Sequence, residues 1–338
     1  MQLIKAAGFT GLTMALMLSA AAWAQQPIVI KFSHVVTNET PKGKGALKFK
    51  ELAEARTQGR VKVELYPNSQ LYKDREEMEA LQLGAVQMLA PSVSKFGPMG
   101  VRDFELFDLP YMFPSKEVLF RVTDGAIGQG LFKKLEAKGI TGLAFWDNGF
   151  KQFSANKPLR ALDDFKGLKV RIQSSKILEA QMKQLGAVPQ VMAFSEVYTA
   201  LQQGVVDGEE NTVSNKYTQK MHEVQKHLTL SDHGVILYAV IVNKKFWDAL
   251  PADIRKSLEE AMVEATKYVR DIAQKENDEA LAHIRAAKTT EVYILPDRDR
   301  ALWQKALLPV HEQYAPIVGR DNIQAIYNLA QQVAQGRK

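Results

Sequence analysis

The sequence contains no cysteine, and this absence excludes several kinds of chemistry at once. Disulfide bonds, thiol nucleophiles and cysteine-ligated metal centres are all impossible in this chain. A chain of 338 residues is nevertheless long enough to be held together by burial of apolar side chains alone. The fold must therefore depend on a hydrophobic core rather than on cross-links.

Long apolar runs are also missing after the first 24 residues, so no later segment is expected to cross a membrane. The beginning of the chain has the form of a secretory leader: Lys5, then an apolar stretch at 12–22, then Ala22-Trp23-Ala24, which matches a signal-peptidase site. An uncleaved membrane anchor is the alternative, but glycines and threonines dilute the segment. We expect cleavage after Ala24 and export to the periplasm.

Charge of one sign does not dominate the sequence. The formal net charge is +6, and the leader carries one lysine and no acid, so a chain that begins at Gln25 would carry +5. Basic residues are scattered, and no nucleic-acid-binding motif occurs, so nucleic acid is not an expected partner. The small excess is compatible with ordinary solubility or with a preference for anionic ligands.

The first part of the chain alternates strand and helix patterns. Apolar alternation predicts strands near 28–35, 60–67 and 84–91, and amphipathic spacing predicts helices at 45–56 and 74–83. This order indicates an α/β fold with a mostly parallel sheet, whose ligand sites lie at the carboxyl ends of the strands.

A second series of the same kind follows a predicted strand at 140–150. Its expected elements are strands at 168–173, 187–192 and 205–212 and helices at 175–185 and 195–203, the latter capped by Ser195. No flexible linker separates the two series, so movement between them would depend on short hinges. We therefore expect a two-lobed α/β fold with a hinge and a cleft between the lobes.

The last third of the chain contributes to both lobes. An apolar strand near 235–242 should return to the first lobe, and an unbroken helical pattern at 251–287 is long enough to span both. The predicted division is a leader at 1–24, lobe I at 25–150 plus about 237–277, and lobe II at 151–236 plus about 278–338.

Catalytic and metal-binding motifs are absent from the sequence. The segment "HEVQKH" at 222–227 resembles a zinc-protease site, but its histidines are five positions apart and would point in different directions on a helix. No nucleophile elbow, phosphate loop or dinucleotide-binding glycine pattern occurs. We expect no metal, no cofactor and no enzymatic activity.

Arg171 is the most informative charged residue. It lies between Val170 and Ile172 in the predicted strand 168–173, just before a Ser-Ser helix cap. A guanidinium in a covered strand needs an anionic partner, and its planar fork can bind a carboxylate through two parallel hydrogen bonds. A salt bridge to Asp164 or Glu179 is the structural alternative.

Other polar residues follow predicted strands at the same edge. Asn211 could donate to a carboxylate and accept from a hydroxyl. The remaining candidates at this edge are His34, Lys151, Ser92 and Lys95. Cations and hydrogen-bond donors outnumber acids in this group, which favours a small anion as ligand.

The sequence resembles the solute-binding proteins of tripartite ATP-independent periplasmic (TRAP) transporters of the DctP type. The resemblance runs through "IKFSHVV", "ELYPNSQLY", "FDLPYMF", "DFKGLKVRIQSS" and "AFSEVYTALQQGVVDGEEN" and covers essentially the whole predicted mature chain. Among these proteins it is most similar to those that bind succinate, fumarate and malate.

The resemblance implies roles for individual residues. Arg171 would form the bidentate bridge to a ligand carboxylate, with Asn211 beside it and Phe194 lining the pocket. Many relatives have an arginine at the position of Lys151, so a ligand role for this lysine is implied with a different geometry. Ser92 and Lys95 would suit a second carboxylate better than a sugar acid. Weaker candidates are Lys73, Trp146 and Tyr238.

The same resemblance implies a function. The protein would be a monomeric receptor that closes around a C4-dicarboxylate and delivers it to a permease with small and large membrane subunits. Two alternatives stay open at this stage: the same fold could bind a 2-oxoacid or an aromatic carboxylate, or the chain could be an exported enzyme that acts on organic acids.

Overall fold

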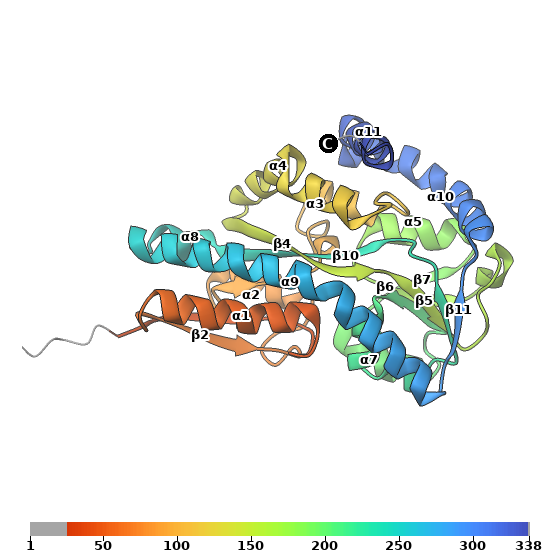
Figure 1. Cartoon of the computed structure of the whole chain (residues 1–338), viewed down its shortest axis with the longest axis horizontal. Helices are drawn as coiled ribbons and strands as arrows, with labels where there is room; N and C mark the ends of the chain where they lie inside the picture. Colours follow the sequence, from red (N-terminus) through yellow and green to blue (C-terminus); the bar gives the residue numbers. More distant parts are fainter. Residues whose placement is uncertain (1–25, 337–338) are drawn as a thin grey trace, which may run out of the picture.

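The computed structural model describes residues 26–336 and contains two mixed sheets surrounded by helices (Figure 1). The first sheet has the strand order β2 (Val61–Tyr66), β1 (Ile28–Ser33), β3 (Met88–Leu89), β10 (Val235–Asn243) and β4 (Ile140–Phe150). Strand β1 runs parallel to β2 and β3, and β10 runs antiparallel to β3 and β4.

The second sheet has the order β11 (Glu291–Ile294), β9 (His227–Leu230), β5 (Gln152–Ala155), β8 (Gly208–Asn211), β6 (Lys169–Ile172) and β7 (Val188–Val191). Strand β6 is parallel to β7 and β8, whereas β5 is antiparallel to β8 and β9. Two α/β units of this kind confirm the predicted fold class.

The chain passes between the sheets three times, once through helix α9 (Ala252–Ala287) and twice through short connections that lie side by side. One short connection joins β4 to β5 at Lys151, and the other joins β9 to β10 through 231–234. The backbone N–H of Lys151 donates to the carbonyl oxygen of Gly234 at 2.9 Å, which ties the two short connections together. We call residues 150–152 and 231–235 the hinge.

Helices cover the faces of both sheets. Those that follow strands of the first sheet are α1 (Pro41–Arg56), α2 (Glu76–Leu83), α3 (Lys116–Asp124), α4 (Ala126–Glu136) and α8 (Lys244–Asp248). Those that follow strands of the second are α5 (Lys176–Gln184), α6 (Val197–Gln202), α7 (Val213–Thr218), α10 (Asp297–Val318) and α11 (Arg320–Ala334). Short 3-10 helices lie at η1 (Val93–Lys95), η2 (Arg102–Asp108), η3 (Leu162–Phe165), η4 (Phe194–Glu196) and η5 (Met221–Glu223).

Helix α9 (Ala252–Ala287) runs along both units, as the sequence predicted. It packs against α1 and β4 at one end and against α7 at the other (Figure 1). Its buried face includes Leu258, Ala265, Val269 and Ile284, which recur at helical spacing. Among residues 26–336, no helix is both long and apolar enough to cross a membrane.

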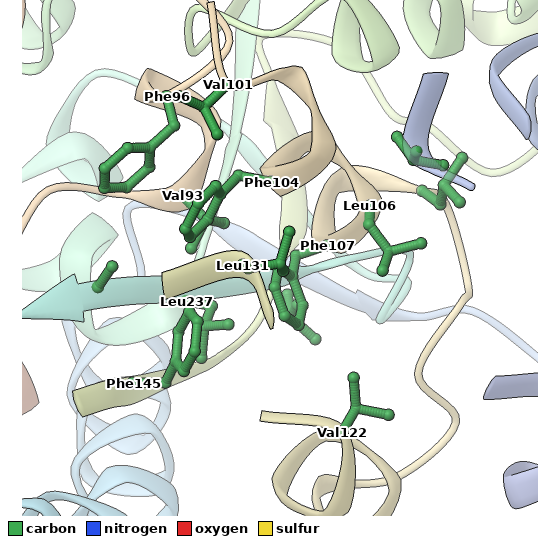
Figure 2. Close-up of a cluster of buried hydrophobic side chains, with 14 of the residues drawn as sticks. Val93, Phe96, Val101, Phe104, Leu106, Phe107, Val122, Leu131, Phe145 and Leu237 are labelled. Carbon is green, nitrogen blue, oxygen red and sulfur yellow. The ribbon is translucent and has the colours of Figure 1, made fainter. Parts of the chain in front are cut away.

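A cluster of aliphatic and phenylalanine side chains forms a large part of the core beside the first sheet (Figure 2). Phe104 stacks on Phe96 with ring centroids 4.3 Å apart, and Phe132 stacks on Phe145 at 4.1 Å. The same cluster includes residues of α10 and α11, and α11 packs against α3. The C-terminal helices therefore touch both halves of the molecule, and the lobe boundaries stay a prediction.

Three predicted elements have different limits in the structure. Helix α1 begins at Pro41 rather than at 45, because the Thr40 hydroxyl caps it by accepting from the N–H of Gly43. Strand β3 contains only Met88 and Leu89. The helix expected to begin at Ser195 is a 3-10 turn at η4 that precedes α6.

Candidate ligand-binding cavity

A small polar cavity lies between the two sheets near the strand ends. Its lining residues come from both sides and are Val35, Val36, Asp74, Ser92, Lys95, Gln173, Phe194, Asn211, Asn215, Ile236 and Tyr238. The cavity has a volume of about 10 Å³, which is room for a single water molecule. A larger ligand can therefore enter only if the two sides move apart.

The structure brings half of the predicted ligand residues together at this cavity. Ser92, Lys95, Phe194, Asn211 and the weaker candidate Tyr238 all line it. Ser92 follows β3 and forms an isolated bridge with Tyr238 in the middle of β10. Asn211 is the last residue of β8. Strand ends of both sheets thus converge as the α/β alternation predicts.

Asn211 is held in one orientation by its neighbours. Its Oδ1 accepts from the backbone N–H of Thr212 at 3.0 Å and from Nδ2 of Asn215 at 2.9 Å. Nδ2 of Asn215 also lies 3.2 Å from the Tyr238 hydroxyl. No hydrogen bond among residues 26–336 uses Nδ2 of Asn211, so this group is left to donate into the cavity.

Arg171 lies behind the cavity wall and is 1% exposed. Its Nε and Nη2 donate to the carbonyl oxygen of Met192 at 3.1 and 2.8 Å, and the guanidinium carbon is 5.8 Å from the centroid of the Phe194 ring. In the described part of the chain, no carboxylate forms an ion pair with it. The carbonyl oxygen accepts from two of the five guanidinium donors, and the charge of Arg171 acts on Asp74 without forming an ion pair with it.

The two salt bridges considered as alternatives for Arg171 do not form. Asp164 Oδ2 accepts from the backbone N–H groups of Arg160 and Ala161 at the start of η3. Glu179 forms an ion pair with Lys176 at 2.8 Å. Both acids are thus engaged elsewhere, and the structural interpretation of Arg171 loses its two named partners.

Lys95 is buried and already neutralised. Its Nζ lies 2.6 Å from Asp74 Oδ1 and 2.5 Å from Glu77 Oε1. Burial alone would lower the pKa of Lys95, but Asp74 and Glu77 outweigh burial and raise it. Burial would raise the pKa of Asp74, yet Lys95 and Arg171 hold it at about 2, so Asp74 is ionised.

Asp74 also links the two sides of the cavity. Its Oδ2 accepts from the backbone N–H of Phe194 at 2.7 Å, across from its own position before α2. A larger groove of about 760 Å³ lies directly beyond Asp74 and Lys95 and shares both residues with the cavity. The Asp74 contacts therefore form the wall between the cavity and the open groove.

His34 is fully buried after β1 and is not a cation at neutral pH. Burial and the nearby charge of Lys42 lower its pKa to about 3. Neither ring nitrogen has a hydrogen-bond partner in the described structure. Because its ring is neutral, His34 can act toward a ligand as a hydrogen-bond donor or acceptor but not as a cation.

The other three candidates lie away from the cavity lining. Lys151 is buried in the hinge, where its Nζ is 2.9 Å from Glu210 Oε2. Trp146 is buried under α9 and donates from Nε1 to the Thr266 hydroxyl at 3.0 Å. Lys73 is exposed and pairs with Glu196 at 3.0 Å. Their ligand roles stay predictions without support from these contacts.

Several lining residues were missed, and some had a signal in the sequence. Gln173 is two positions after Arg171, a spacing that places both side chains on one face of an extended strand, whereas Asn215 lies in α7 and not in the strand that ends at Asn211, so no spacing signalled it. Asp74 was assigned to a helix start. The histidines of "HEVQKH" are in η5 and β9 rather than on one helix, and no cluster of metal-binding side chains occurs within the described residues.

Comparison with known families gives one clear match. Residues 32–316 match the model of the DctP family, described as "Bacterial extracellular solute-binding protein, family 7". The chain is 64% identical over 319 residues to the C4-dicarboxylate-binding periplasmic protein DctP of Rhodobacter capsulatus, which covers 94% of this chain and 95% of the relative.

Solved structures agree with this match. A TRAP periplasmic solute-binding protein from Shewanella oneidensis with bound succinate is similar with a TM-score of 0.86 and 44% identity, covering 89% of this chain and 98% of that one. Another from Pseudomonas aeruginosa with bound L-malate has a TM-score of 0.83 and 43% identity, covering 85% of this chain and 100% of that one. Both structures span nearly the same elements as the chain described above.

Proposed function

Because the chain belongs to family 7 of the bacterial extracellular solute-binding proteins, we propose that it is a receptor for C4-dicarboxylates such as succinate, malate and fumarate. The ligand would be bound in the cavity between the two sheets. The family consists of binding proteins, which agrees with the expectation that the chain is not an enzyme. The similarity to the Rhodobacter DctP protein and to structures with bound succinate and malate supports the choice of ligand class.

One observation carries the proposal: Arg171 is a buried guanidinium without a carboxylate partner among the described residues. A buried charge of this kind is costly unless an anion meets it. The guanidinium carbon of Arg171 is 5.8 Å from the ring centroid of Phe194, which lines the cavity together with Asn211. A ligand carboxylate bound by Arg171 and Asn211 would satisfy both groups.

Binding requires the cavity to widen, and the hinge allows it. The small cavity would open when the Asp74–Phe194 hydrogen bond and the Lys73–Glu196 ion pair separate. A ligand that contacts residues of both sides stabilises the closed form by its difference in affinity for the two forms. The adjacent groove would be the route of entry.

The proposed partner is a TRAP permease with small and large membrane subunits, driven by an ion gradient. This part of the proposal rests on the family and on the names of its similar members. The receptor would act in the periplasm as a monomer. The predicted leader and its cleavage site after Ala24 lie outside the described residues.

A ligand screen tests the proposal. Thermal unfolding is measured with succinate, malate, fumarate, lactate, pyruvate and benzoate, and titration calorimetry follows for those that stabilise. A ligand present at about a hundred times its Kd adds about 2.7 kcal/mol to the free energy of unfolding. Stabilisation by lactate, pyruvate or benzoate equal to that by succinate would refute the dicarboxylate assignment in favour of a monocarboxylate.

A further inference from the structure

Five lysine and arginine side chains are buried in the part of the chain that the structure describes, and their partners differ. The five are Lys42, Lys95, Lys151, Arg171 and Lys216. Three of them form ion pairs: Lys95 with Asp74 and Glu77, Lys151 with Glu210, and Lys216 with Glu209. Only Lys42 and Arg171 have no carboxylate within ion-pair distance among residues 26–336.

Lys42 lies in the first turn of α1 and is 1% exposed. Its Nζ donates to the carbonyl oxygen of Ala90 at 3.0 Å and lies 3.8 Å from the centroid of the Tyr238 ring. A lysine has three N–H donors, so a single carbonyl leaves most of its capacity unused. Tyr238 lines the cavity and Ala90 is two residues before the lining residue Ser92, so the ammonium lies behind the ring of Tyr238, next to lining residues but not among them.

The surroundings of the two unpaired cations are alike. Each donates to one backbone carbonyl, and each lies against an aromatic ring that lines the cavity: Lys42 against Tyr238, and Arg171 against Phe194. Lys42 comes from the helix that follows the first strand of the first sheet, and Arg171 comes from the second sheet. Each sheet thus supplies one buried cation that forms no ion pair and lies next to a ring that lines the cavity.

On this basis we propose that Lys42, rather than Lys95, binds the second carboxylate of the dicarboxylate, with Arg171 binding the first. The inference rests on the proposed function. A dicarboxylate carries two negative charges, and Lys42 and Arg171 are the two buried cations in the described residues that form no ion pair. Lys95 is already neutralised by two acids, so an incoming carboxylate would have to compete with both.

If a carboxylate binds to Lys42, ligand binding should also change the protonation of this lysine, which can be measured on the wild-type protein. Burial, and to a smaller extent Lys95, lower the pKa of Lys42 to about 7, while Glu77 and Asp74 oppose this. The other titratable groups that face it are His34, whose pKa of about 3 leaves it neutral, and Tyr238, whose pKa is raised by burial. A carboxylate bound to Lys42 would raise the pKa of this lysine, so binding above neutral pH must take up a proton.

The first experiment combines a side-chain change with a ligand change. Succinate and its monoamide, succinamate, are titrated into the wild-type protein and into Lys42→Met at pH 6 by calorimetry. We expect the wild type to prefer succinate by about 10- to 100-fold, as for loss of one charged hydrogen-bonding partner. Lys42→Met should bind both ligands with nearly equal affinity, because neither can use a second cation.

A matched control removes a lysine two positions along the same helix. Lys44 forms an ion pair with Glu276 of α9 and is about one-third exposed, whereas Lys42 is buried and unpaired. Lys44→Met should keep the wild-type preference for succinate. If Lys42→Met also keeps that preference, the proposal is wrong and the second carboxylate binds elsewhere.

The second experiment uses the wild type alone and is unaffected by folding of a variant. Calorimetric titrations with succinate are run in buffers of different ionisation enthalpy from pH 5.5 to 8.5. Proton uptake should be near zero at the acidic end and approach one proton at the basic end, and Lys42→Met should abolish it. Binding of succinate without pH-dependent uptake would overturn the role of Lys42 but leave the proposed function intact, whereas no binding of any dicarboxylate would overturn the function itself.

Discussion

Two pairs of buried cations differ in their partners: Lys151 and Lys216 beside strand β8, and Lys42 and Arg171 near the cavity. Lys151 in the hinge and Lys216 in α7 each form an ion pair with a glutamate of β8, Glu210 and Glu209. Lys42 and Arg171 each donate to a backbone carbonyl and lie next to an aromatic ring, and neither forms an ion pair among the described residues. The same residue types at the same degree of burial thus have two kinds of surroundings.

The difference shows why burial of a charge does not by itself identify a ligand site. A paired ion contributes to holding the strands together, and removing one partner leaves the other in a region of low dielectric. An unpaired ion destabilises the protein until a ligand supplies the missing charge. Partner identity, rather than residue type, separates the two classes.

The largest expected effect is on the hinge, through Lys151→Met. The variant leaves Glu210 buried without its lysine, which should lower the free energy of unfolding by about 3–5 kcal/mol. Urea denaturation at pH 7 measures this loss. The double variant Lys151→Met/Glu210→Gln should recover part of it, and a single variant as stable as the wild type would contradict a structural role for the pair.

The same pair predicts a loss of stability in acid. Burial would raise the pKa of Glu210, but Lys151 and His233 lower it to about 2 from the ordinary value of 4.5. The unfolded chain therefore binds more protons than the folded one between these values, so the stabilisation is present above pH 4.5 and is lost as the pH falls toward 2. Between pH 5 and pH 3 the free energy of unfolding should therefore fall more steeply for the wild type than for the double variant, so the difference between them should shrink, as urea denaturation at each pH would show.

Arg171→Lys tests the role of Arg171, the buried cation of the second sheet that forms no ion pair. The variant keeps the charge but loses the planar fork, so succinate affinity should fall by about 2 kcal/mol, roughly 30-fold. Calorimetry with succinate measures this, and the stability of the ligand-free protein serves as the control because it should change little. An unchanged affinity for succinate would show that Arg171 has a structural role and does not bind the ligand through its planar guanidinium.

Lys42→Met tests whether an unpaired cation costs stability. The pKa of Lys42 is about 7 in the folded protein against an ordinary value of 10.5, so the unfolded chain binds more protons in that interval. Stability of the wild type should rise with pH from 7 to 10.5, and the full cost of the charge is present below pH 7. Lys42→Met should therefore unfold at higher urea concentration at pH 6, by about 1–4 kcal/mol. A less stable variant would place Lys42 with the paired cations.

The smallest effect is expected for Lys73→Ala. This exposed lysine pairs with Glu196 across the cleft at 3.0 Å, with both side chains about half exposed. Solvent and salt screen such a pair, so succinate affinity should stay within about two-fold of the wild type. A much larger loss at low ionic strength would show that exposed pairs also control closure.

Much of the fold could be predicted because it depends on local patterns. The alternation of strands and helices, the full length of β4 and the long helix α9 all follow from spacing of apolar residues. The helix start at Pro41 and the 3-10 turn at η4 differed because a capping hydroxyl and backbone geometry decide such ends within one turn.

The candidate site was predicted less completely. Ser92, Lys95, Phe194, Asn211 and Tyr238 do meet at one cavity, since strand ends of an α/β fold converge. Lys42 was missed because a lysine in the first turn of a helix usually lies in solvent. Lys151 was counted with the ligand cations because no pattern in the sequence shows that Glu210 faces it.

The sequence by itself determined the family, the alternation of elements and the presence of a cation in strand β6. Only the tertiary structure decided which cations are neutralised, because pairing joins residues that are distant along the chain, such as Lys95 with Glu77 and Lys151 with Glu210. Charge compensation depends on distances of a few ångströms between separate elements. Those distances are set by packing. Packing leaves neither Lys42 nor Arg171 in an ion pair with a carboxylate of the described residues.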